Sequence, residues 1–110
     1  MADLDLGAIA GDAAAAMLGV IKKNGADIKQ YAAAEAQKIA TSCAQIAQLR
    51  AQGIITDEEM RLHLDIQKNA SRAVLMAVKG IAIITAEQAV NAAIGVVSAA
   101  VGKALGFALI

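Results

Sequence analysis

The sequence predicts an all-α protein. None of its 110 residues is proline, and 28 are alanine, the strongest helix former. No segment shows the alternation of apolar and polar residues that is typical of a half-buried strand. Alanine buries little area, and Tyr31 and Phe107 are the only aromatic residues, so a single copy would be short of bulk. We therefore expect helices that assemble into a multi-chain helical bundle.

The first expected arm of the fold covers residues 8–52. Along its second half, apolar residues recur every three or four positions, as in a helix with one buried face. The positions of this stripe, which ends at the turn, are Ile28, Ala32, Ala36, Ile39, Cys43, Ile46 and Arg50. Asn24-Gly25 resembles a helix end, which leaves open a break in the arm near these two residues.

A turn over residues 53–56 is the clearest local signal. Gly53 suits the left-handed position that ends a helix. Thr56 and Glu59 have the spacing of a capping box, in which each side chain bonds the backbone of the other residue. Ile55 and Met60 fit the flanking hydrophobic staple. These signals predict a hinge between two helices, with Gly53, Thr56 and Glu59 as its key residues.

The second expected arm covers residues 57–106, and the whole chain forms one domain, 1–110. The arm contains no proline and no cap signal, so we expect one uninterrupted helix of about 70 Å. The two arms together predict a long helical hairpin. Fifteen of the twenty charged residues lie between Lys22 and Lys79, and the hairpin brings the two charge-poor ends together. The expected shape is a rod with a charged hinge end and an apolar tip.

Small residues recur every four positions in the charge-poor segments. Glycine within a helix costs about 0.5–1 kcal/mol relative to alanine, and close helix–helix contact can offset that cost. The alternative explanation is that these glycines mark loops or frayed ends. The residues expected to pack between helices in the assembly are Gly7, Gly11, Ala15, Gly19, Gly95, Ser98, Ala99, Gly102 and Gly106.

A polar stripe in the last segment includes Glu87, Gln88 and Asn91, which are expected to face either a lumen or an interface. The charge-free run from Gln88 to Gly102 has 15 residues, whereas a membrane span needs about 20. Extending the run back to Gly80 brings in Glu87, an expensive residue at the bilayer centre. A permanent single-pass anchor is therefore not expected, and insertion as an oligomer remains open.

Catalytic and cofactor chemistry is not expected. His63 has Glu59 one turn before it, but a metal site needs three or four ligands. Cys43 lies in the apolar stripe, where a cysteine acts as a small apolar residue. Zero net charge and the absence of a long basic run argue against nucleic acid. We predict no metal, no cofactor and no small-molecule substrate. Asp3 and Asp5 occupy the place of a positive signal-peptide start, so synthesis in the cytoplasm without such a signal is expected.

The expected function is that of a non-enzymatic, self-assembling helical hairpin with an apolar small-residue tip. In this reading the protein is a membrane-associated or pore-forming homo-oligomer, with copies of itself and lipid as partners. The alternative is a soluble structural or adaptor protein that forms a dimeric four-helix bundle or a filament.

Overall fold

The computed structural model describes residues 5–21, 26–77 and 81–106. These residues form no strand, and the prediction of an all-α fold is confirmed. The helices in this part of the chain are α1 (Leu6–Ile21), α2 (Ala26–Ala51), α3 (Asp57–Met76) and α4 (Ile83–Leu105).

The first helix begins at a side-chain cap. The Oδ1 of Asp5 accepts a hydrogen bond from the backbone N–H of Ala8 at 3.0 Å, which satisfies one of the unpaired donors at the start of α1. One face of the helix then turns inward, at steps of three or four residues. Its buried residues are Ala10, Ala13, Met17 and Ile21.

The turn between α2 and α3 is held by hydrogen bonds at both helix ends. Gly53 has a positive φ of 77°, and its N–H donates to the Arg50 carbonyl at 3.0 Å. The N–H of Ile54 donates to the Leu49 carbonyl, also at 3.0 Å, which completes a Schellman motif. On the α3 side, the Thr56 hydroxyl accepts from the N–H of Glu59 at 3.1 Å. The Glu59 carboxylate accepts from the N–H of Thr56 at 2.9 Å. This is the capping box that the sequence predicts.

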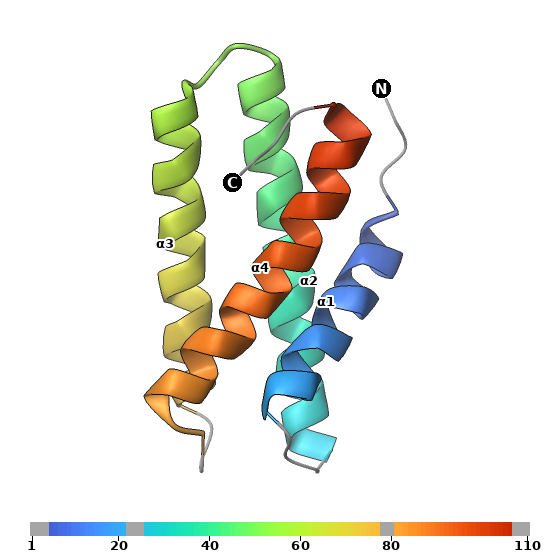
Figure 1. The fold of residues 1–110 in the computed structure, drawn as a ribbon, viewed down its shortest axis with the longest axis vertical. Helices are drawn as coiled ribbons and strands as arrows, with labels where there is room; N and C mark the ends of the chain where they lie inside the picture. Colours follow the sequence, from blue (N-terminus) through green and yellow to red (C-terminus); the bar gives the residue numbers. More distant parts are fainter. Residues whose placement is uncertain (1–4, 22–25, 78–80, 107–110) are drawn as a thin grey trace.

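The four helices run alternately up and down in a flattened bundle (Figure 1). Helices α2 and α4 contact each other across the middle, and both contact α1 on one side and α3 on the other. Over the described residues α1 and α3 do not meet. The Cα atoms extend over 42 × 25 × 15 Å.

The prediction of one uninterrupted second arm was wrong. Helix α3 ends at Met76 and α4 begins at Ile83, and the molecule is 42 Å long rather than about 70 Å. The backbone at Ala77 keeps ordinary right-handed helical angles, and no side chain caps α4 at Ala82. Folding back lets the apolar face of α4 pack against the other three helices, and this tertiary packing outweighs local helix propensity.

The two charge-poor segments lie against each other as α1 and α4, but the predicted apolar tip at the end opposite the hinge is not formed. Helix α1 runs alongside α2 and α4, and α4 also packs against α3, so neither helix extends beyond the bundle (Figure 1). The start of α1 and the end of α4 point toward the same end of the bundle as the 53–56 turn. The expected break at Asn24-Gly25 lies outside the described residues, although α1 ends at Ile21 and α2 begins at Ala26 on either side of it.

The core is continuous between the helices and is built largely from small side chains. Its bulkier members come from every helix: Met17, Ile39, Met60, Leu75, Val90, Val97 and Val101 are fully buried. Many of the remaining buried positions are alanine. Backbones therefore approach closely, but each contact removes little apolar surface from water.

Candidate assembly surfaces

The predicted small residues of α1 lie on its solvent side. Gly7, Gly11, Ala15 and Gly19 are all exposed. A Cβ atom built on Gly11 or Gly19 would meet no other atom within 4 Å, and one on Gly7 would meet only Asp5 Oδ1 at 3.5 Å. Nothing within the described chain therefore requires glycine at these positions. We call this row the outer face of α1.

The predicted small residues of α4 divide into three groups. Ser98 and Gly102 are buried inside the bundle, and the Ser98 hydroxyl has no hydrogen-bond partner among the described residues. Gly106 caps the helix with a φ of 83°. Gly95 and Ala99 are exposed, and a Cβ on Gly95 would meet no atom within 4 Å. The structure thus leaves part of the predicted row available to another molecule.

The polar stripe of α4 continues along the same exposed side. Gln88 and Asn91 are exposed, and Glu87 is half-buried. They join Gly95 and Ala99 at steps of three or four residues, and these four exposed residues (Gln88, Asn91, Gly95 and Ala99) form the outer face of α4. Asn91 also borders an open cavity of about 290 Å³ between α3 and α4. The other residues that line this cavity are Leu64, Asp65, Lys68 and Ile94.

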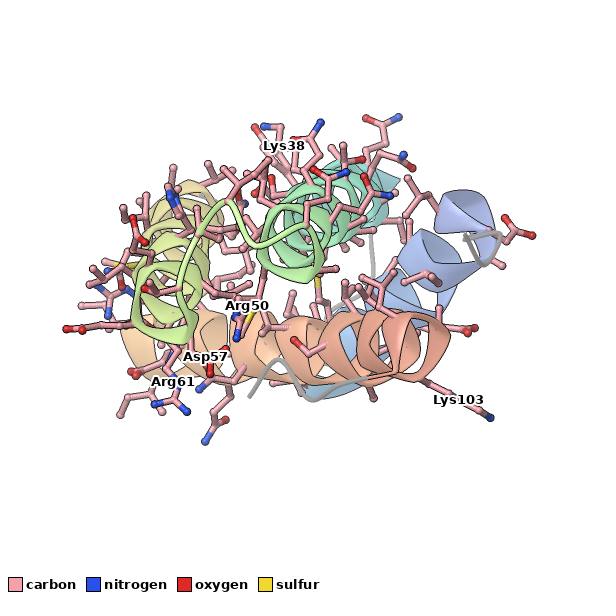
Figure 2. The ribbon with its side chains drawn as sticks, turned by 90° about the horizontal axis from the view of Figure 1, so that it is seen from above. Lys38, Arg50, Asp57, Arg61 and Lys103 are labelled. Carbon is pink, nitrogen blue, oxygen red and sulfur yellow. The ribbon has the colours of Figure 1, made fainter. Side chains whose placement is uncertain are left out.

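Charged side chains lie on both sides of the 53–56 hinge. The guanidinium of Arg50, at the end of α2, bonds the carboxylate of Asp57, at the start of α3 (Figure 2). This bond lowers the pKa of Asp57 below its usual value, and Arg61 adds a smaller effect in the same direction. The capping bonds from Thr56 lower the pKa of Glu59 in the same way. Both carboxylates therefore stay ionised at neutral pH and stabilise the turn.

Two features of α2 and α3 were not expected from the sequence. Glu35 has the i, i+3 spacing to Lys38 of a surface pair, but it is buried, and its carboxylate accepts a hydrogen bond from the exposed Lys38 Nζ at 3.2 Å. Its position three residues after Ala32, inside the buried stripe of α2, was the available signal. The second missed feature is a row of exposed apolar side chains on α3, which includes Leu62 and Ile66.

Candidate chemical groups are not assembled into a reactive centre in the described part of the chain. Cys43 is buried, and burial raises the pKa of its thiol to about 11. A thiol with that pKa stays protonated and is a poor nucleophile or metal ligand. Among residues 5–21, 26–77 and 81–106, no three His, Cys, Asp or Glu side chains lie close enough to hold a metal ion.

Helix α4 is long and apolar enough to cross a membrane by length and composition. In the bundle, 39% of its most apolar 18-residue stretch is buried. Such a helix is found both as a membrane span and as the core helix of a water-soluble bundle. Helix α1 is apolar but shorter.

Comparison with family models, curated proteins and solved structures finds no match to the chain.

Proposed function

We propose that the chain is a non-enzymatic helical protein that self-assembles through the outer faces of α1 and α4 and acts as a membrane-associated, pore-forming oligomer. The observation that carries the proposal is the set of exposed helical glycines with open space around them. Alanine at Gly11, Gly19 and Gly95 would stabilise each helix by about 0.5–1 kcal/mol without a clash. Glycine in place of alanine therefore lowers helix stability at these positions. Close packing of another helix against the glycines would offset that lower stability.

The membrane part of the proposal is supported by the composition of the two helices that carry these faces. In its described residues, α1 contains one charged side chain, Asp12, and α4 contains two, Glu87 and Lys103. Lys103 lies in the last turn of α4 and points into solvent (Figure 2). A helix with so few charges is compatible with lipid once its polar side is covered by other helices.

Entry into a membrane requires α4 to leave the bundle. Its inner face holds mostly small residues, such as Ala86, Ala89 and Ala93, so separation exposes less apolar area than in a leucine-rich core. In the inserted oligomer, this inner face would turn toward lipid. The outer face, with Gln88 and Asn91, would line the space between copies.

The experiment compares two matched substitutions on exposed helix faces. Gly95→Leu blocks close approach on the outer face of α4, whereas Ala33→Leu adds bulk to an exposed position of α2. We expect Gly95→Leu to reduce both the oligomer mass in sedimentation and dye release from liposomes, while Ala33→Leu leaves both unchanged. Equal behaviour of the two variants would contradict assembly through this face.

The second candidate is a soluble structural or adaptor protein that forms a dimer or a filament. It is favoured by the burial of the inner face of α4, because Val90, Val97 and Val101 are already covered without lipid. A single dimeric species in detergent-free buffer, together with intact liposomes at micromolar protein, would select this candidate. Electron microscopy of the purified protein would reveal a filament.

A further inference from the structure

Helix α3 has an apolar face on each side. The inner residues Met60, Leu64, Ser71 and Leu75 are buried in the bundle. On the opposite side Leu62 is 57%, Ile66 is 66% and Met76 is 39% exposed. Figure 1 shows α3 at the edge of the bundle, where it contacts only α2 and α4 over the described residues. A surface helix with a single partner face normally carries polar residues on its far side.

The exposed residues follow the heptad spacing of a coiled coil. Successive members are four and three residues apart in turn, so they form one straight seam along the helix. These residues are Leu62, Ile66, Asn69, Ala73 and Met76, which we call the outer seam of α3. We propose that the outer seam is a self-association surface on which α3 of a second copy packs antiparallel. This surface is separate from the outer faces of α1 and α4 and does not depend on their association.

Charge complementarity identifies the occupant as a second copy and fixes its direction. In an antiparallel pair, Ile66 lies opposite Asn69 of the second copy, and Leu62 lies opposite Ala73. Asp65 and Arg72 flank the seam on the same side. This register sets Asp65 of each copy against Arg72 of the other, so two opposite-charge pairs form by symmetry.

Neither of these side chains is engaged within the described chain. The two ion pairs of the described residues are Glu35–Lys38 and Arg50–Asp57. The Nε of Arg72 is buried and has no hydrogen-bond partner among the described residues, so it is out of reach of another chain. Only the terminal amino groups of this half-buried side chain are left to bond a carboxylate from outside the chain.

Other arrangements fit the same residues less well. In a parallel pair, Asp65 and Arg72 would lie opposite Ala70 and Ala77 of the second copy, so neither charge would gain a partner. An anionic membrane surface would attract Arg72 but repel the acidic first turn of α3 and Asp65.

The seam also predicts the strength of the pair. It spans two heptads, and Asn69 places a polar side chain opposite Ile66 at its centre, which lowers the stability of a coiled coil. We therefore expect a reversible association that depends on protein concentration and weakens at high salt, because the flanking charge pairs are solvent-accessible.

A charge-exchange experiment tests the proposal. Asp65→Arg sets two cations against each other across the seam, and Arg72→Glu sets two carboxylates against each other. Each variant alone should self-associate about tenfold more weakly than the wild type in sedimentation equilibrium. An equimolar mixture of the two should recover association, since one chain then offers cations where the other offers carboxylates. A mixture that behaves as the sum of its two components would overturn the proposal.

Controls separate this surface from the others. Circular dichroism tests whether each variant is folded. If Arg72→Glu does not fold, Ile66→Ala takes its place in the experiment. Ile54→Ala is the matched control for Ile66→Ala, because Ile54 is 63% exposed but lies in the turn between α2 and α3. Ile66→Ala should weaken association and Ile54→Ala should not. Loss of flotation with phosphatidylglycerol vesicles in Ile66→Ala, with self-association unchanged, would contradict the proposal and indicate a membrane contact. Gly95→Leu should leave pairing through the outer seam of α3 intact. Loss of pairing through the seam can therefore be told apart from loss of association through the outer face of α4.

Discussion

Replacement of Gly95 by alanine is expected to stabilise the isolated chain. The position lies within α4, is exposed, and has no heavy atom within 4 Å of an ideal Cβ, so the new methyl group causes no clash. It also buries almost no area, which leaves helix propensity as the main effect. Glycine is less favourable than alanine within a helix by about 0.5–1 kcal/mol, so the free energy of unfolding should rise by about that amount.

Urea denaturation at low protein concentration measures this change with little contribution from association. Repeating it at several concentrations shows whether dissociation adds to the free energy of unfolding. Gly53→Ala is the matched control, because φ at Gly53 is 77° and a side chain there should cost about 1–2 kcal/mol. A destabilising Gly95→Ala would contradict this expectation, because it would mean that the space beside Gly95 is already occupied in the folded chain.

Three further predictions follow from the hinge and the core. Thr56→Ala removes the hydroxyl that accepts from Glu59 and should lower the free energy of unfolding by about 0.5–2 kcal/mol in urea; an unchanged value would show that the capping box is not needed. Folding lowers the pKa of Asp57 and Glu59, so their stabilising effect is present above the unfolded values of 3.8 and 4.5 and is lost as pH falls through the lower folded values. Melting temperatures measured from pH 7 to pH 3 should therefore fall, and a rise would contradict this sign. The Cys43 thiol, with a pKa of about 11, should react slowly with iodoacetamide at pH 8 in the folded chain and rapidly in urea, whereas equal rates would indicate an open core.

The hinge was predictable because its determinants are local. Gly53, Thr56 and Glu59 lie within seven residues, and each acts on backbone groups close to it in the sequence. The break between α3 and α4 was not predictable in this way. Ala77 and Ala82, at its edges, carry no side-chain cap, and the fold-back is stabilised by contacts of α4 with helices far away in the sequence.

For the candidate surfaces too, part could be predicted from local sequence and part depends on the packing of distant helices. A spacing of four residues identified small residues on α1 and α4, because periodicity alone shows which positions share a face. It did not show which of them the bundle would cover, and Gly102 and Ser98 proved to be inside while Gly95 stayed outside. For this reason Gly95, rather than Gly102, is the position at which a leucine tests assembly, since a leucine at Gly102 would overpack the core.

The buried Glu35 was missed for a related reason. Its i, i+3 spacing to Lys38 is typical of a solvated surface pair, and only the packing of neighbouring helices reveals that the carboxylate is covered. The outer seam of α3 was visible in the sequence as a heptad pattern. It became informative once the structure showed that the opposite face of the same helix is already used.

The most direct test of self-assembly is sedimentation equilibrium of the wild type and of a Gly11→Leu, Gly95→Leu double variant, each with and without lipid. We expect a wild-type mass that rises with concentration, a double variant with a markedly smaller mass, and an Ala33→Leu control that matches the wild type. A wild-type chain that remains monomeric at every concentration, in buffer and in lipid alike, would contradict self-assembly.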